Sequence, residues 1–417
     1  MSEPDIAQQG ESHDPRNIVL DAAVLLQNNG QATSTTLLAV DRLNSGLGIH
    51  SQLVPSWQSL ILAGADPRAA AVTPTGVNMR RVAAAMRVID RAEDGPLDPV
   101  DVAAGLCAAA TLRQANAAVF VLACATGSAA LAVIFGAEDV RTALLAAASA
   151  AAGGVIRRML GRFGLGVLVQ AFAAAVVAGI VGAVAVHLHL GAAGVVALCP
   201  ALILVPGPHI LNGALDLISL RVSLGMARVG YASIVLTVIA SGLIVGLGMG
   251  GQTLPVTGGA VAVPLHVDVL AAAVAAASYS VYFSMPYRMI GWPVLAGMAA
   301  HGVHWWASSV VGTGPATAAL LSCLLVGAML VPMSHFLRMP FAAIGFAAVV
   351  SLVPGMFVFR ALSGMLQLQT DASAEVLAAA VSDSAVAAGV VAAMAIGLVV
   401  PIRLRDNLIR RHSHGKS

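Results

Sequence analysis

The sequence predicts an all-α polytopic membrane protein with ten transmembrane helices arranged as two inverted five-helix repeats, plus a small cytoplasmic α/β N-terminal domain. Of the 417 residues, 58% are hydrophobic and only 10% are charged, and the mean hydropathy is +0.87. That balance leaves too little polar surface for a water-soluble protein. In addition, charge is concentrated at the two ends of the chain, and the tetrapeptide Leu-Val-Pro-Gly occurs at both Leu204–Gly207 and Leu352–Gly355.

The distribution of charge divides the chain. Residues 1–114 hold 8 Arg and 12 acidic residues, residues 115–402 hold 9 Arg and 7 acidic residues, and the last 15 residues hold five basic residues and one Asp. The N-terminus is polar and has no apolar segment typical of a signal peptide. We therefore predict a disordered N-terminus, a cytoplasmic α/β domain, two five-helix transmembrane modules and a basic cytoplasmic tail, at residues 1–14, 15–113, 115–250, 266–401 and 402–417.

The N-terminal domain is expected to contain four helices and two strands. Helical patterns cover about 16–28, 33–46, 77–93 and 98–113, and β-type runs cover 50–62 and 69–74. Asp98 before Pro99 is typical of a helix N-cap followed by proline at the first helical position. Residues 33–36 are interpreted as the start of the second helix rather than as nucleophiles. Docking against the cytoplasmic mouth or oligomerisation is favoured for this domain, and a hydrolase role is the alternative.

Ten apolar segments follow the N-terminal domain. About 20 apolar residues are needed to cross roughly 30 Å of hydrocarbon. The candidates lie at about 115–135, 141–156, 165–187, 193–211, 229–250, 266–285, 290–310, 315–335, 340–360 and 376–401. With ten spans, most arginines fall on the side of the N-terminal domain, as the positive-inside rule requires, and only Arg141 and Arg360 do not. Both termini are then cytoplasmic.

The repeated tetrapeptide indicates an internal repeat. Its two copies are 148 positions apart, and adding that shift to the first five spans reproduces the last five. Because each half has an odd number of helices, the second half would cross the membrane in the opposite sense. Inverted repeats of this kind are typical of secondary transporters, whose substrate sites lie near the midplane beside interrupted helices.

The stretch after Leu204 interrupts the fourth span. Pro206 and Pro208 have no N–H, so they free carbonyl groups that must be buried in protein or face a water-filled cavity. If the helix resumes, His209, Asn212 and Asp216 share one face. The alternative is that the span ends at Gly207 and these polar residues face the cytoplasm.

Other polar residues in the apolar body have two interpretations each. Asp383 is predicted to carry a proton, or else to be hydrogen-bonded by Ser382 or Ser384. Asp268 is expected at the membrane interface.

His301 and His304 have too few neighbouring ligands for zinc, and a proton relay is the alternative. Tyr279, Tyr282 and Trp292 resemble interfacial anchors, although Tyr279 and Ser278 could instead bond a substrate hydroxyl. The four cysteines are interpreted as small apolar residues.

Residues Leu204–Arg228 resemble the motif of the threonine/serine exporter family: a Pro-Gly break, Asn-Gly, Asp-Leu and spaced arginines. The segments LLQNNGQATSTTLLAVDRL and GVNMRRVAAAMRVIDRA in the N-terminal domain are similar to that family too. GWPVLAGMAAHG and SLVPGMFVFRALSGM resemble its second module, so the chain looks like a fused two-module form. By this resemblance the motif residues are Pro206, Gly207, Asn212, Gly213, Asp216, Arg221, Gly225 and Arg228, with Pro354 and Gly355 in the second module. The Asn-Gly and Asp-Leu elements have no counterpart after Gly355.

The resemblance implies a secondary active, proton-coupled exporter of threonine and serine in the bacterial cytoplasmic (inner) membrane. Its expected partners are the small-molecule substrate, protons and the lipid bilayer, without nucleic acid, and homo-oligomerisation is left open. We expect no catalytic residue, metal or cofactor. A dicarboxylate exporter, for example of succinate, and a membrane-anchored hydrolase are the alternatives. The candidate substrate-binding residues are Pro206, Gly207, His209, Asn212, Asp216, Pro354, Gly355 and Tyr279; the candidate gate is Arg221 and Arg228; the candidate proton-coupling residues are Asp383 and Asp216.

Overall fold

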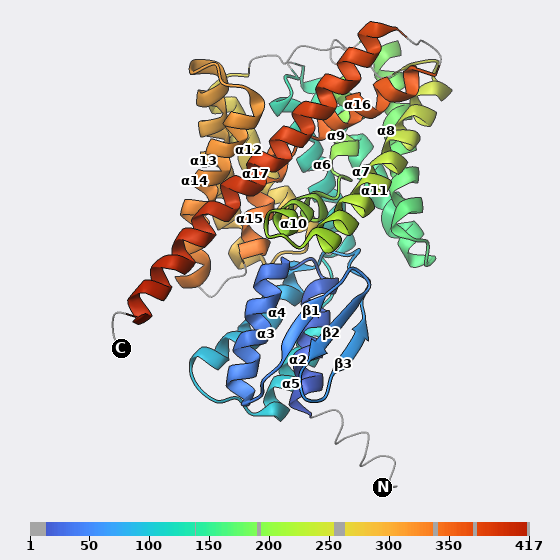
Figure 1. Cartoon of the computed structure of the whole chain (residues 1–417). Helices are drawn as coiled ribbons and strands as arrows, with labels where there is room; N and C mark the ends of the chain where they lie inside the picture. Colours follow the sequence, from blue (N-terminus) through green and yellow to red (C-terminus); the bar gives the residue numbers. More distant parts are fainter. Residues whose placement is uncertain are drawn as a thin grey trace.

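The computed structural model describes residues 14–137, 139–189, 193–253, 263–336, 341–369 and 373–414. The predicted N-terminal tail before residue 14 and the last three residues lie outside these ranges, as does most of the loop between the two predicted modules. Figure 1 shows a helical body with a smaller N-terminal unit, called the head below, at one end. The head comprises residues 15–113.

The head contains a three-stranded antiparallel sheet and four helices. In chain order its elements are α2 (Pro15–Asn28), α3 (Thr33–Leu47), β1 (Gln52–Pro55), β2 (Ser59–Ala63), β3 (Arg68–Ala71), α4 (Met79–Ile89), the 3-10 turn η1 (Asp90–Glu93) and α5 (Pro99–Ala110). The side chain of Asp98 accepts a hydrogen bond from the backbone N–H of Val100, and Pro99 begins α5, so the predicted N-cap is confirmed. Thr33 begins α3, as predicted.

The prediction of one continuous strand at residues 50–62 was wrong. The run folds back on itself as an antiparallel β1–β2 hairpin in which Leu53 pairs with Leu62. The backbone N–H of Ser56 donates to the carbonyl of Ser59 and closes the turn. Because Pro55 has no N–H, it ends β1. Leu53, Leu60 and Leu62 then point into the head core, while Val54 and Ile61 are exposed.

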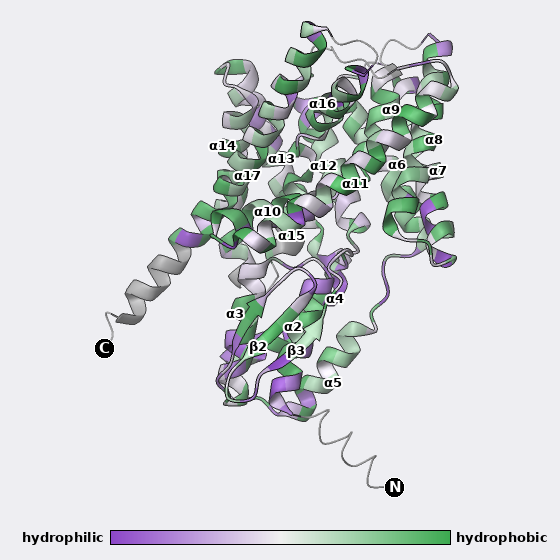
Figure 2. Ribbon diagram, turned by 45° about the vertical axis from the view of Figure 1, so that its right-hand side comes forward, coloured by the Kyte–Doolittle hydropathy of each residue, from purple (hydrophilic) through white to green (hydrophobic). Residues whose placement is uncertain are grey.

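The body is built from apolar helices (Figure 2). Seven helices of the described residues are long and apolar enough to cross a membrane. They are α6 (Ala117–Ile134), α7 (Val140–Arg162), α8 (Val167–His187), α11 (Val222–Met249), α12 (Leu265–Tyr282), α14 (Pro315–Phe336) and α17 (Ala374–His414). The chain is therefore a multi-pass membrane protein. A further helix, α13 (Gly291–Trp305), has only 15 residues and continues into a π-helical turn, η3 (Trp306–Val310).

Two further spans are bent at the repeated tetrapeptides. The first is formed by α9 (Ala193–Leu202) and α10 (Gly207–Ile218), which meet at 64°. The second is formed by α15 (Phe341–Val349) with the 3-10 turn η4 (Val350–Leu352), followed by α16 (Gly355–Gln367), and it bends by 50°. Counting each bent pair as one span gives up to nine spans in the described residues, against the ten predicted. The predicted fourth span, 193–211, is too short, because the helix resumes after the break and continues to Ile218.

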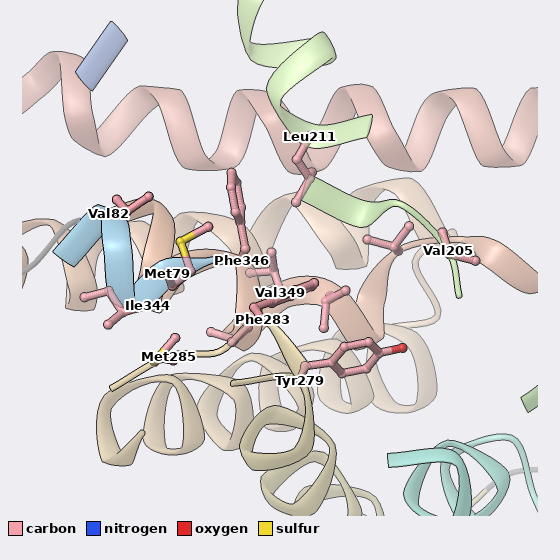
Figure 3. Packing of buried hydrophobic residues seen from close by; sticks show 14 of the residues in the cluster. Met79, Val82, Val205, Leu211, Tyr279, Phe283, Met285, Ile344, Phe346 and Val349 are labelled. Carbon is pink, nitrogen blue, oxygen red and sulfur yellow. The ribbon is translucent and has the colours of Figure 1, made fainter. Parts of the chain in front are cut away.

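The head packs directly against the body. The backbone N–H of Met79 at the start of α4 donates to the carbonyl of Phe283 (2.9 Å). Just after the head, the N–H of Ala115 donates to Ser284 Oγ (3.0 Å). Figure 3 shows Met79 and Val82 of the head among Ile344 and Met285 of the body. This apolar contact fixes the head beneath both broken spans.

Candidate functional site

The two broken spans have the same local backbone structure. Pro206 has φ −78° and ψ 57°, and Pro354 has φ −76° and ψ 46°. In both, the N–H of the following glycine donates to the carbonyl two residues earlier, at 2.8 Å for Gly207 and 2.7 Å for Gly355. The repeated tetrapeptide therefore produces the same tight turn twice.

These two breaks contact each other. A Cβ atom added at Gly207 would lie 3.0 Å from Val350 Cγ2, and one added at Gly355 would overlap the Leu202 side chain. Each glycine thus allows the opposite broken span to approach closely. Figure 3 shows Val205 of the first break and Val349 at the end of α15 in one apolar cluster.

A cavity of about 10 Å³ remains where the breaks meet. Its walls include Val205, Ser351, Gly355 and Tyr279. The hydroxyl of Tyr279 donates to the carbonyl of Leu202 (3.3 Å). This carbonyl lies four residues before Pro206, so it lacks the usual α-helical donor, and it accepts instead from the N–H of Val205 (3.2 Å). The interpretation of Tyr279 as an interfacial anchor was wrong, because its side chain is buried (2% exposed) against the first break.

A second cavity, of about 530 Å³, lies between the first break and the head. Leu204, Val205, Pro206, Pro208 and His209 form the part of its wall that belongs to the break. The head contributes Thr75, Gly76 and Val77, and the end of α7 contributes Arg157, Arg158 and Arg162. None of the described lining residues is Asp or Glu. A volume of this size is typical of small-molecule sites.

Arg157 and Arg158 make the cavity electropositive. Arg157 donates a hydrogen bond to the Tyr282 hydroxyl, and its guanidinium carbon lies 5.4 Å from the centre of the Tyr282 ring. The Arg158 guanidinium lies 4.1 Å from the centre of the Phe120 ring and donates to the Ala115 carbonyl. The Nε atoms of both arginines are buried without a hydrogen-bond partner in the described part of the chain. In the sequence these arginines indicated only the orientation of the chain in the membrane, so their position at a cavity was not predicted.

The polar face of α10 lies against the head. His209 Nε2 lies 2.9 Å from the Pro74 carbonyl oxygen, and Asn212 Nδ2 donates to the Gly30 carbonyl (3.3 Å). The helix resumes at Gly207 as α10, so His209, Asn212 and Asp216 lie on one helix. Its polar residues are covered by loops of the head, and His209 also borders the larger cavity.

Asp216 is the centre of a buried ion network between the head and the body. Arg228 Nε lies 3.3 Å from one carboxylate oxygen, and Arg221 Nη1 lies 3.2 Å from the other. Thr33 Oγ1 of the head donates to Asp216 (2.9 Å) and accepts from Arg228 Nη2 (3.1 Å). Asp216 and Arg228 are only 2% and 3% exposed. The two predicted gate arginines and Asp216 are therefore brought together, with a threonine from the start of α3.

Asp383 is buried and paired with an arginine. Its carboxylate lies 3.0 Å from Arg360 Nε, which joins α17 to α16 just after the second break. Of the two serines predicted as alternative partners of Asp383, Ser382 and Ser384, Ser384 donates to the Ala380 carbonyl. Arg360, which the positive-inside rule left unexplained, is explained by this pair.

Asp268, which was expected at the membrane interface, lies in the first turn of α12. Asp268 is 7% exposed, and its carboxylate lies 3.1 Å from His301 Nδ1. His301 Nε2 lies 3.0 Å from Ser351 Oγ, immediately before the second break. His301 was a candidate from the sequence, but the cluster was not predicted, since Asp268 and Ser351 lie 33 and 50 positions from His301.

A multi-pass membrane protein in which two broken helices meet beside a polar cavity has the architecture of a membrane transporter. Comparison with known families gives the family itself. Residues 17–250 match the family described as "Putative threonine/serine exporter", and residues 268–403 match "Threonine/Serine exporter, ThrE". The chain therefore belongs to the threonine/serine exporter family, whose members are transporters, and it has both modules in one polypeptide. No solved structure matches the chain.

Proposed function

We propose that this protein is a secondary active, proton-coupled exporter of threonine and serine in the bacterial cytoplasmic membrane, with both termini in the cytoplasm. The observation that carries the proposal is that the two Pro-Gly breaks abut at the end of the arginine-lined cavity. Substrate would enter this cavity from the head side and reach the outside when the breaks separate.

The positions of the helices support two inverted five-helix repeats. A shift of 148 residues carries α6 (117–134) onto α12 (265–282) and α8 (167–187) onto 315–335, within one residue of α14 (315–336). The same shift carries α10 (207–218) onto 355–366, against 355–367 for α16. Under this proposal α7 corresponds to α13 with η3, and α11 to α17, so the breaks are related by the repeat.

The chemistry of the cavity suits the two charges of an amino acid. The guanidinium groups of Arg157 and Arg158 would hold the carboxylate, because planar donors of this type match carboxylate geometry. The carbonyl of Leu204, four residues before Pro208, has no helical N–H to accept from and would receive the ammonium group. Pro206 and Gly207, with Pro354 and Gly355, would then form the part of the path that opens.

The ion pairs suggest how opening would be controlled. Arg221, Arg228 and Asp216 would act as the inner gate, because they hold α10 to the head. Asp383 and Asp216 would take up a proton; protonation of either carboxylate would weaken its pairing with arginine and loosen the adjoining helix.

Counterflow of labelled threonine into proteoliposomes loaded with unlabelled threonine tests the proposal. We expect exchange above protein-free vesicles, and a tenfold or larger rise in the half-saturating threonine concentration for Arg157→Gln. Arg141→Gln is the matched control, because Arg141 is an exposed residue of the same helix and does not line the cavity. Folded wild-type protein without exchange would contradict the proposed function.

Dicarboxylate export is the second candidate, and a specific observation favours it. The cavity walls contain Arg157, Arg158 and Arg162 and no acidic residue among the described residues, so two carboxylates could be held. Succinate added in excess during threonine counterflow separates the two substrates. Inhibition by serine without inhibition by succinate supports the amino-acid exporter, whereas the reverse supports the dicarboxylate exporter.

A further inference from the structure

A buried acid–base cluster joins three segments of the second half of the body. Asp268 comes from the first turn of α12, His301 from α13 and Ser351 from η4. The carboxylate of Asp268 and the hydroxyl of Ser351 lie 3.1 Å and 3.0 Å from the two ring nitrogens of His301. All three residues are buried. Because burying a carboxylate and an imidazole within an apolar helix bundle is unfavourable, such groups usually have a function.

The cluster ends at the junction of the two breaks. Ser351 lies three residues before Pro354 and lines the cavity of about 10 Å³ where the breaks meet. The opposite walls are Leu202 and Val205 of the first break, and Tyr279 from α12. This volume corresponds to about one water molecule. It is too small for an ester or amide substrate, so the resemblance to a Ser-His-Asp hydrolase triad does not indicate a nucleophile here.

We propose that Asp268, His301 and Ser351 form a proton-binding site whose protonation state is transmitted to the second break. This inference rests on the proposed proton-coupled export and adds a third proton-binding site to Asp383 and Asp216, at the junction of the two breaks. Histidine is the side chain whose protonation changes most readily near neutral pH. The cluster lies at the point where the two broken spans must separate.

The hydrogen bonds give the means of transmission. When His301 carries the proton, both ring nitrogens donate, Nδ1–H to the Asp268 carboxylate and Nε2–H to the Ser351 oxygen. When the Nε2 proton leaves, that nitrogen becomes an acceptor and the Ser351 hydroxyl turns to donate to it. The hydroxyl proton of Ser351 is then no longer available to the cavity between the breaks. Gain or loss of one proton at His301 therefore reverses a hydrogen bond in η4.

Few other ionisable groups lie near the cluster. His304 is one turn further along α13, with its ring centre 6.4 Å from that of His301. The described residues of α6, α14, α15 and η3, which pack around α12 and α13, contain no Asp, Glu, Lys or Arg. Their ionisable groups are Cys124, Cys323 and His335, and apart from Asp268 α12 carries His266, Tyr279 and Tyr282. Arg288 in η2 (Tyr287–Met289) is 13 positions before His301, about 20 Å along a helix.

The decisive experiment separates substrate exchange from proton coupling in proteoliposomes. Labelled threonine counterflow is measured at equal pH on both sides, and threonine transport driven by a pH gradient is measured in the same vesicles. For His301→Gln we expect counterflow within about threefold of the wild type and loss of the stimulation by the pH gradient. Ser351→Ala should behave in the same way, whereas Ser351→Thr keeps a hydroxyl and should retain the stimulation. His304→Gln is the matched control on the same helix and should respond like the wild type.

Several results would overturn the inference. One is full stimulation by the pH gradient in His301→Gln, and another is the same loss in His304→Gln. A wild-type protein that exchanges threonine but ignores a pH gradient also contradicts the proton site, and leaves the exchange function standing. A wild-type protein without exchange contradicts the proposed function itself. Elution as a single species in detergent identifies folded variants, and Ser351→Ala decides the question if His301→Gln does not fold.

Discussion

At the scale of single residues, Asp216 connects the two parts of the molecule. Its carboxylate contacts Arg221 and Arg228 of the body and Thr33 of the head. Arg228 is 3% exposed, so water cannot replace a lost carboxylate partner. A buried charge that loses its partner is more costly than a pair that is replaced as a whole.

We therefore expect Asp216→Asn to lower the free energy of unfolding by about 3–5 kcal/mol, because Arg228 is left as an uncompensated buried charge. Chemical denaturation in detergent measures the change. Asp41→Asn is the control, since Asp41 is an exposed residue of α3, the helix that Thr33 begins. Adding Arg228→Gln to Asp216→Asn should recover part of the loss. If Asp216→Asn alone is as stable as the wild type, the interpretation of this ion network is contradicted.

Sequence patterns predicted single residues best where the cause was local. Asp98 was identified as a helix cap from the proline that follows it, and the structure confirms the cap. Asp268 was assigned to an interface because its position near the start of a span was visible, whereas its partner His301 was not. The site role of Arg157 was not predicted for a similar reason. The positive-inside rule already accounted for its charge, and only the fold brings it to Tyr282 and the first break.

At the scale of elements, α8 and α11 pack with their backbones in contact. A Cβ atom added at Gly246 would overlap the backbone oxygen of Val176, and one added at Gly179 would overlap that of Leu243. Small residues permit this close approach between membrane helices. These contacts hold α8 against the later half of α11, the helix that carries Arg228 near its start.

Gly246→Ala is expected to destabilise the protein by about 1–3 kcal/mol, because the helices must move apart to admit a methyl group against backbone. Gly248→Ala, two residues further along α11, has no atom within 4 Å of the added Cβ. Alanine favours the helix by up to about 1 kcal/mol over glycine, so this control should be as stable as the wild type or more stable. Thermal unfolding of the two variants in detergent compares them directly. Equal losses of stability in Gly246→Ala and Gly248→Ala would show that the α8–α11 contact is not close.

Some secondary-structure elements were predictable from local sequence signals and others were not. Both breaks were predicted from Pro206 and Pro354, because proline acts on its own backbone whatever surrounds it. The β1–β2 hairpin was missed, since its turn around Trp57 lacks the Asn-Gly or Asp-Gly pair that marks tight hairpins. α13 has only 15 helical residues before it changes to a π-helical turn, a detail of backbone geometry that the hydropathy of residues 290–310 did not reveal.

At the scale of the whole molecule, the four cysteines test the division into head and body. Cys107 is exposed in the head, and Cys124, Cys199 and Cys323 are buried in the body. None of them forms a disulfide.

A water-soluble maleimide should therefore label one thiol per folded chain in detergent and four after denaturation. Mass spectrometry of the intact protein counts the added groups. Cys107→Ser should reduce labelling of the folded chain to none. Rapid labelling of a second cysteine before denaturation would contradict the packing of α6, α9 or α14 described above.

Docking of the head was predicted only as one of two uses, and its partner was not predicted. The sequence indicated that His209, Asn212 and Asp216 share a helix face, but not that Pro74, Gly30 and Thr33 would cover it. Those contacts join positions 135 to 183 apart. Two of them use backbone carbonyls, which leave no trace in the choice of amino acid.

The cover over α10 also has a consequence for biosynthesis. The head precedes α10 in the chain, so the ribosome has already delivered the residues that receive His209, Asn212 and Asp216 when that segment reaches the bilayer. We therefore expect the head to cover the polar face of α10 while that helix inserts. A chain without the head would insert α10 with its polar face uncovered. We expect such a chain to be degraded rather than to accumulate in the membrane.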